Sequence, residues 1–156
     1  MPGLHDLGAH PGFFRIGPGS LDWLRVGVEA IESRIANFVM SDDPDDPEAP
    51  LASLLWLPPA FVLPRHSHNC HRVEVIVQGS VTIDGQVLRP GDVSVSGPDE
   101  FYGPNIAGPT GSLSVEIFSR AEGIVPQPAE DQGSEQQETL QRFAAAVEEH
   151  QRTLNR

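Results

Sequence analysis

The chemically richest stretch of the sequence is a run of polar and ionisable side chains at residues 64–74, which reads Pro-Arg-His-Ser-His-Asn-Cys-His-Arg-Val-Glu. In an extended strand, His66 and His68 project from the same face with their Cα atoms about 6.6 Å apart, because each residue rises about 3.3 Å. Two imidazoles at this spacing can bind one cation, since metal–nitrogen bonds are about 2.0–2.1 Å long. The pattern predicts a metal site with His66 and His68 as neutral ligands.

The same alternation selects the residues that would complete this site. Cys70, Arg72 and Glu74 share the face of the two histidines if the strand stays regular beyond residue 70. Glu74 is then the anionic third ligand, and open positions remain for a catalytic metal. Cys70 or His71 is an alternative ligand, and a thiolate would favour zinc or a softer ion. In a further alternative, Arg72 takes the metal's place and pairs with Glu74, which leaves a metal-free pocket for an anion.

Short strands must position these residues. Fifteen glycines and fifteen prolines among 156 residues interrupt the chain too often for a helical bundle. Asp84-Gly85 lies between two strand-like runs and predicts a hairpin, because both turn positions favour positive φ. The runs with strand character are 24–28, 35–40, 51–57, 73–77, 79–83, 86–88, 93–95 and 113–118. Such a series predicts an all-β fold, a closed or sandwiched antiparallel barrel.

The segment 58–104 resembles the core of the cupins, and the resemblance extends over roughly residues 50–118. His66, His68 and Gly79 match the first cupin motif, and Pro90-Gly91-Asp92 matches the start of the second. The chain is similar to small single-domain cupins of the anti-sigma-factor-like type. The resemblance implies a jelly-roll barrel whose inward histidines and acidic side chains hold a divalent ion such as Fe, Mn, Zn or Ni. It also implies a homodimer.

Two positions depart from the cupin pattern. The position four residues after the second histidine, where the family usually has glutamate, is Arg72. The position of the second-motif histidine is Gly103, and no histidine occurs between His71 and His150. The resemblance therefore implies that the usual fourth ligand is absent. It leaves Glu74 to substitute for the displaced glutamate and Tyr102 to act as a ligand or as a hydrogen-bond donor to a substrate.

The chain divides into four parts on composition. Residues 1–20 are an irregular arm, 21–120 the barrel, 121–133 a linker and 134–156 an amphipathic helix. Ser134 and Gln137 form a capping-box pattern at the start of this helix. The apolar stripe of the helix must pack on its own barrel or on a partner subunit. We expect residues 41–50, which are acidic and contain three prolines, to form an exposed loop, and we expect His150 to lie on the surface and Trp23 and Trp56 in the core.

Charge and composition limit the possible binding partners and the cellular location of the protein. A net charge of −12 and a pI near 4.7 oppose binding to nucleic acid. The longest apolar run, 54–63, contains two prolines and falls short of the roughly 20 residues that a bilayer span needs. A single cysteine, Cys70, and an N-terminus that lacks the pattern of a signal peptide predict a cytoplasmic protein.

The functional hypothesis is a metal-dependent enzyme that acts on a small organic molecule inside a barrel lined by Val and Ile. The metal would polarise a carbonyl group or bind dioxygen, and Tyr102 or Arg72 would orient the substrate, in isomerase, cyclase, lyase or dioxygenase chemistry. The alternative is a non-catalytic ligand-binding module or a redox or metal sensor, in which Cys70 responds to redox state. A third possibility is that the loop 41–50 and the helix recruit a protein partner.

Overall fold

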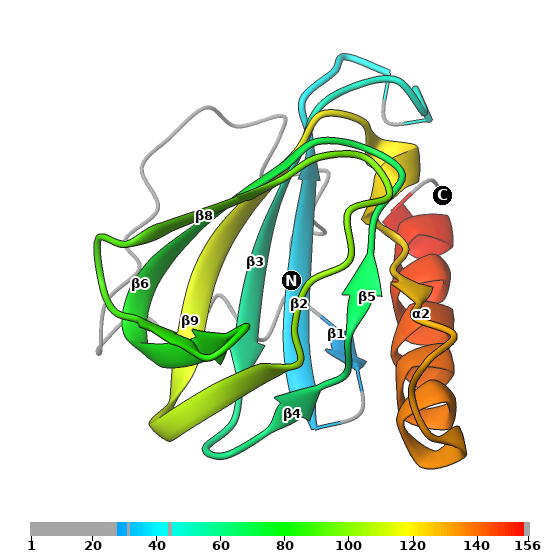
Figure 1. The fold of residues 1–156 in the computed structure, drawn as a ribbon. Coiled ribbons are helices and arrows are strands. Elements are labelled where there is room, and N and C mark those ends of the chain that lie inside the picture. The colour runs from blue at the N-terminus through cyan, green and yellow to red at the C-terminus, as the bar shows by residue number, and fades with distance from the viewer. Residues whose placement is uncertain (1–27, 31, 44, 155–156) are drawn as a thin grey trace.

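Two antiparallel sheets and a C-terminal helix make up the described part of the chain, which is residues 28–30, 32–43 and 45–154 of this computed structural model (Figure 1). The large sheet has the order β1-β2-β3-β9-β6-β7, with β8 paired to β6 and β4 to β9, and the small sheet pairs β5 with β10. The elements are β1 (Val28–Ala30), β2 (Ser33–Val39), β3 (Leu51–Leu57), β4 (Val62–Leu63), β5 (His66–Ser67), β6 (Arg72–Ile83), β7 (Gln86–Leu88), β8 (Val93–Ser96), β9 (Asn105–Phe118), the 3₁₀ helix η2 (Ala121–Ile124), β10 (Gln127–Pro128) and α2 (Ser134–Leu154). The predicted all-β class with a terminal helix is confirmed.

The turn at Asp84-Gly85 forms as predicted. Both residues have positive φ, 49° and 78°, and Ile83 lies opposite Gln86 in the pairing of β6 with β7. A two-residue loop with two positive φ angles matches the twist of the strands that it joins. The expected strand at 24–28 lies outside the described residues except for its last residue, which begins β1.

The long central strands exceed their predicted length. The runs 73–77 and 79–83 are one strand, β6, and the run 113–118 is the second half of β9. The register of β6 with β9 shifts between Ile76 and Gln78 and again between Gly79 and Val81, and Gly79 has a φ of 69°. Such irregularities bend a strand without ending its pairing, so a glycine that resembled a strand end is a bend within β6.

The outer face of β6, β8 and β9 carries valines and an isoleucine. Val95, Val93 and Ile117 are 67%, 52% and 44% exposed. Val73 lies opposite both Val95 and Ile117, so it shares their outer face. The expectation that the strand valines line the interior is therefore wrong for these strands, although Ile76, Val81 and Ile83 are buried inside.

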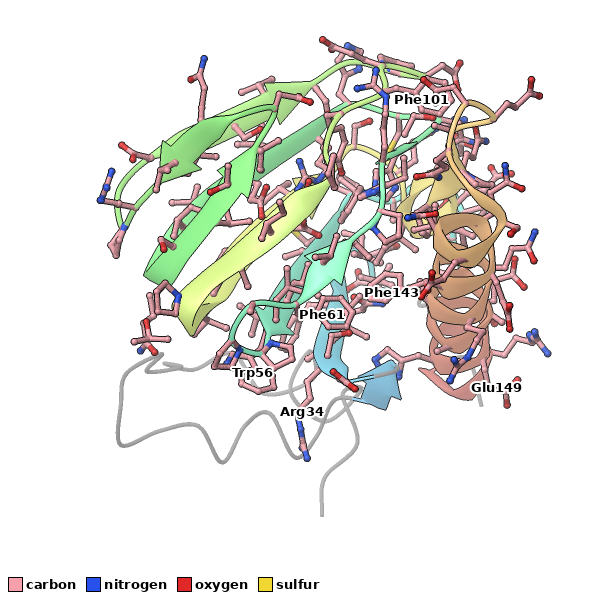
Figure 2. The ribbon with its side chains drawn as sticks, turned by 60° about the horizontal axis from the view of Figure 1, so that its bottom comes forward. Arg34, Trp56, Phe61, Phe101, Phe143 and Glu149 are labelled. Atoms are coloured by element: carbon pink, nitrogen blue, oxygen red, sulfur yellow. The ribbon has the colours of Figure 1, made fainter. Side chains whose placement is uncertain are left out.

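Helix α2 packs its apolar stripe against its own barrel. Leu140, Phe143 and Val147 are buried in a cluster that contains Leu51 and Leu57 of β3. Figure 2 shows Phe143 of α2 on the side that faces Phe61 of the barrel, whereas Glu149 points away.

Two side chains and the helix start differ from the predictions. His150 is 3% exposed, so the prediction of a surface histidine is wrong, and Trp56 is half-buried. At the helix start, the backbone amide of Gln137 donates to the carbonyl of Gly133, and its side-chain amide donates to the carbonyls of Glu130 and Gln132. The backbone amide of Gln137 therefore does not bind Ser134 as the predicted capping box requires. No helix in the described part of the chain has the length and apolar character needed to cross a membrane.

The segments flanking the barrel are ordered against it. The acidic loop is mostly exposed as predicted, but Ala49 is buried and its carbonyl accepts from the amide of Ala121. The expected linker 121–133 contains β10, which pairs with β5, and η2, whose Gly123 carbonyl lies 2.9 Å from the Nδ1 of His68. This C-terminal segment therefore reaches the predicted histidine site.

Candidate functional site

The two predicted histidines lie at the small sheet. His66 in β5 pairs with Pro128 of β10 and, on its other side, exchanges backbone hydrogen bonds with Tyr102. His68 follows β5, and its carbonyl accepts from the amide of Asp99. Both rings are buried, with 2% and 5% of their residues' surface exposed. The prediction that both histidines face the barrel interior agrees with this burial.

Backbone carbonyls fix the orientation of both imidazoles. The Nδ1 of His66 lies 2.7 Å from the carbonyl oxygen of Pro64, and the Nδ1 of His68 lies 2.9 Å from that of Gly123. A carbonyl only accepts, so Nδ1 carries the proton in each ring and Nε2 is left with a lone pair. Burial lowers the pKa of His66 to about 4 and that of His68 well below 6.5. Both rings are therefore neutral at neutral pH.

The chain bends after the second histidine, which removes Cys70 from the predicted ligand set. Residues 69 and 70 form a bend, and regular strand geometry returns only at Arg72, so the assumed single strand is broken. Cys70 is 2% exposed in the apolar cluster, and a Cβ placed on Gly123 would lie 2.2 Å from its Sγ atom. His71 is exposed. Cys70 is a tightly packed core thiol.

Arg72 occupies the centre of a buried ionic cluster. Its Nη2 lies 2.6 Å from Oε2 of Glu74 and 2.5 Å from Oε1 of Glu116, and its Nε lies 3.2 Å from the same Glu116 oxygen. The side chain of Arg72 has no exposed surface, and those of Glu74 and Glu116 have 3% and 7%. Glu74 is therefore engaged by Arg72, as the alternative interpretation of the sequence predicted.

Glu116 is the functional residue that sequence reasoning missed. It lies in an alternating run where apolar side chains would ordinarily face the core and the charged one would face solvent. The orientation is reversed because Glu116 lies opposite Glu74 of β6 and Ser53 of β3, all on the inner face. One signal in the sequence was available. Phe118 lies two residues after Glu116 and so shares its face of the strand, and a large aromatic residue is usually buried. Phe118 is 1% exposed.

Tyr102 joins the histidines to the ionic cluster. Its ring centroid lies 4.7 Å from that of His66 and 6.3 Å from that of His68, and the Arg72 Cζ lies 4.6 Å from it. The centroids of His66 and His68 are 5.2 Å apart, and Phe118 contacts His68. The structure thus brings together five of the six predicted site residues, all but Cys70.

Two hydrogen-bond donors in this cluster have no partner. Among the residues that the structure describes, nothing pairs with Nη1 of Arg72 or with the hydroxyl of Tyr102, and both atoms are buried. A buried donor without an acceptor costs about 1–3 kcal/mol, so such atoms are rare in native proteins. The two side chains contact each other, since the Arg72 Cζ lies 4.6 Å from the centroid of the Tyr102 ring.

The donor set does not fit a divalent metal. In the described ranges, no three His, Cys, Asp or Glu side chains are placed to hold an ion. The two imidazoles offer Nε2, but Glu74 and Glu116 both bind Arg72, and a guanidinium carries its positive charge at any ordinary pH. The predicted three-ligand site of His66, His68 and Glu74 is not formed in this arrangement.

Comparison with known proteins identifies the fold. No family model matches the sequence, and no curated protein matches it. The solved structures include similar ones. The polyketide cyclase RemF from Streptomyces resistomycificus has a TM-score of 0.53 and 16% identity, with 76% of this chain and 85% of that chain covered.

Two further solved structures are similar. A variant of oxalate decarboxylase from Bacillus subtilis has a TM-score of 0.51 and 14% identity over 63% of this chain, but only 28% of that chain. An RmlC-like cupin from Shewanella frigidimarina has a TM-score of 0.45 and 19% identity over 64% of this chain and 78% of that chain. The antiparallel barrel, the buried histidine pair and the likeness to the two structures with TM-scores above 0.5 lead to one conclusion: the chain has the cupin jelly-roll fold.

Proposed function

We propose that the barrel binds a small, uncharged, polar organic molecule without the help of a metal ion. The observation that carries this proposal is the pair of buried donors without partners, Nη1 of Arg72 and the hydroxyl of Tyr102. A carbonyl or hydroxyl oxygen of a ligand would accept from both and remove the cost of leaving them unpaired. The roles of Arg72 and Tyr102 are thus to bind and orient the ligand.

The charge of the site favours a neutral ligand over an anion. One guanidinium faces two carboxylates, so the cluster has no positive charge left for an anion when both are ionised. Burial, and then the charge of Glu74, raise the pKa of Glu116 against the opposing effect of Arg72. Retention of a proton on Glu116 would make the cluster neutral overall. An additional buried negative charge would then be disfavoured, which argues against the anion pocket predicted from the sequence.

The histidines add a requirement for a donor on the ligand. With Nδ1 bonded to a backbone carbonyl, each Nε2 presents a lone pair. A ligand with a hydroxyl or amide N–H beside its carbonyl would match acceptors and donors together. The proposed class is therefore a hydroxy-carbonyl compound or the corresponding amide.

The rival function is the metal-dependent enzyme predicted from the sequence. One observation favours it, because metal-binding histidines usually donate their second ring N–H to a backbone carbonyl, as His66 and His68 do. It requires a third donor, and both nearby carboxylates are bound to Arg72. Turnover by this chain therefore depends on a rearrangement of the ionic cluster.

A matched ligand pair tests the proposal. Salicylamide and salicylate share a skeleton and a hydroxyl group but differ in charge, and calorimetric titration at pH 7 measures the affinity for each. We expect the amide to bind more tightly and Tyr102→Phe, which removes only the hydroxyl, to weaken it about tenfold, as for loss of one hydrogen bond. A broader set of amide and carboxylate pairs extends the test to other skeletons. Preference for the carboxylates throughout the set, or affinities unaltered in Tyr102→Phe, contradicts the proposal.

The outer face of the large sheet supports a homodimer. Val95, Val73 and Ile117 lie side by side across β8, β6 and β9, and Val93, Val75 and Val115 form the neighbouring row. Val93, Val95 and Ile117 are exposed and the other three are half-buried, and a contiguous apolar patch on a surface is typical of contact surfaces. Light scattering after size exclusion should give twice the chain mass for the wild type and the chain mass for Val95→Lys.

We place the dimer in the cytoplasm because the single cysteine suits a reducing compartment.

A further inference from the structure

Arg72 is the only charged group at the centre of the described barrel interior that can balance its buried carboxylates. Its guanidinium binds Glu74 and Glu116 and lies over the ring of Tyr102. It is also close enough to the two histidine rings to interact with both electrostatically. Side chains from β5, β6 and β9 therefore surround one positive charge, which is the guanidinium of Arg72.

The surrounding donors are those that a divalent metal would use. Two imidazole Nε2 atoms and two carboxylates make a nitrogen and oxygen set that suits Zn, Mn, Fe or Co. The rings of His66 and His68 are already held in the metal-binding tautomer by backbone carbonyls. In the present arrangement of the described residues no three of these side chains are placed to hold an ion, and Arg72 holds both carboxylates.

We propose that the Arg72 guanidinium takes the place of a divalent metal ion in this barrel and excludes metal from it, and that removal of the guanidinium opens a site formed by His66, His68, Glu74 and Glu116. The exclusion has two physical causes. A divalent ion next to a buried guanidinium meets like charge at low dielectric, and both carboxylates would have to give up their hydrogen bonds with Arg72. This inference deepens the proposed function, since it rests on the same metal-free cluster.

Substitution of Arg72 tests the inference. Wild type, Arg72→Ala and Arg72→Lys are purified without chelator, dialysed against EDTA and then titrated with Co²⁺, whose visible absorption reports coordination by protein ligands. We expect one Co²⁺ per chain in Arg72→Ala, with a rise in melting temperature, and none in the wild type. Arg72→Lys is the matched control because it keeps a positive charge at the centre, and it should also stay free of metal.

Further variants locate the ion. Adding His66→Ala or His68→Ala to Arg72→Ala should abolish Co²⁺ binding, whereas adding His71→Ala, which alters an exposed histidine, should leave it intact. If Arg72→Ala does not fold alone, it should fold when Zn²⁺ is supplied during refolding, and Arg72→Gln is examined in the same way. Failure of both variants to fold with Zn²⁺, or folded variants without bound metal, overturns the inference.

The inference and the proposed function fail in different ways. Binding of one Co²⁺ at the histidines of the wild type overturns the exclusion of metal, whatever ligand the barrel binds. Failure of the wild type to prefer neutral ligands contradicts the proposed ligand class but leaves the metal result in place.

Discussion

Glu74 and Glu116 lie directly opposite each other on β6 and β9, and both carboxylates bind the same nitrogen of Arg72. Two like charges at directly opposite positions of a sheet destabilise it, and burial increases the effect. The guanidinium offsets part of this repulsion, although the pKa of Glu116 stays raised by burial and by the charge of Glu74. The stability of the barrel and the chemistry of its interior therefore depend on one side chain.

Loss of this cation should destabilise the protein severely. We expect Arg72→Ala, in the presence of EDTA, to lower the free energy of unfolding by about 3–5 kcal/mol, the usual cost of leaving a buried charge without its partner. Glu116→Gln in the same chain should recover part of this loss because it removes one of the two unpaired carboxylates. Urea denaturation at pH 7 measures both. Equal stability of the single and double variants would mean that the carboxylates do not repel each other.

Acid should weaken the fold through His66. Its folded-state pKa of about 4 lies below the ordinary value of 6.5, so as the pH falls the unfolded chain binds this proton first. The contribution of His66 to the free energy of unfolding is fully present above pH 6.5 and is lost as the pH falls from about 6.5 to about 4. We expect a loss of about 2 kcal/mol from this group by pH 5, at 1.36 kcal/mol per pH unit.

The His66→Gln variant isolates this effect. Urea denaturation of the wild type and the variant at pH 7.5 and pH 5 gives the difference that belongs to the imidazole. The comparison cancels the contribution of Glu116, whose raised pKa acts in the opposite direction. His150, with a pKa lowered to about 4 by burial, should contribute in the same direction as His66. A variant that loses as much stability in acid as the wild type would contradict the assignment.

The contact between Gly123 and Cys70 should not tolerate an added methyl group. A Cβ at position 123 would lie 2.2 Å from the Sγ atom and 2.7 Å from the Cβ of Cys70. We expect Gly123→Ala to lower the free energy of unfolding by about 1–3 kcal/mol through overpacking. Gly97→Ala is the control, since the nearest atom to its Cβ is 3.6 Å away. Thermal denaturation measures the difference between the two variants. Equal melting temperatures would contradict the prediction and would mean that η2 moves aside to accommodate the added methyl group.

Helix α2 should stabilise its own barrel. Leu140 has no exposed surface, and we expect Leu140→Ala to cost about 2–5 kcal/mol because the cavity that it leaves cannot close. Arg142→Ala, on the exposed side of the helix, should change the stability little. The same packing argues against the third hypothesis, in which the apolar stripe of the helix recruits another protein. A loss of oligomerisation in Leu140→Ala, without a loss of stability, would favour that hypothesis.

The thiol of Cys70 should be inert in the folded protein. It is 2% exposed and packed against η2, and a thiol reacts only where a reagent reaches it. We expect Ellman's reagent to modify Cys70 at the rate of unfolding in buffer and within seconds in concentrated urea. Fast modification of the native protein would support the redox-sensor interpretation of the sequence.

Local sequence patterns were sufficient to predict the fold class, the hairpin at Asp84-Gly85 and the terminal helix. Each rests on interactions between residues close in the sequence, such as two turn residues with positive φ. The spacing of His66 and His68 also predicted that the two side chains lie on one side of the chain, and their ring centroids are 5.2 Å apart. The pairing of Arg72 with Glu74 was open between two interpretations, because whether a carboxylate binds a metal or a guanidinium depends on what lies across the sheet.

The rest of the site depends on contacts between distant parts of the chain. Glu116 becomes an inner residue only through its register with Ser53 and Glu74, and no single strand contains that information. The position of Cys70 depends on a bend and on the approach of Gly123. The outward valines of β6 and β8 show why alternation fixes the period of a strand but not which face is buried.

The hydrogen bond from the His68 ring to the carbonyl of Gly123 joins residues 55 positions apart, and the bond from Arg72 to Glu116 spans 44. Neither can form early, because long loops must close before such contacts stabilise the chain. During refolding, the signal from the ordered imidazoles should therefore appear in the slowest phase, together with docking of the C-terminal segment. A nascent chain that ends before η2 would lack the carbonyl that fixes the tautomer of His68. The capacity of the barrel to bind anything at its centre should thus arise only in the last step of folding.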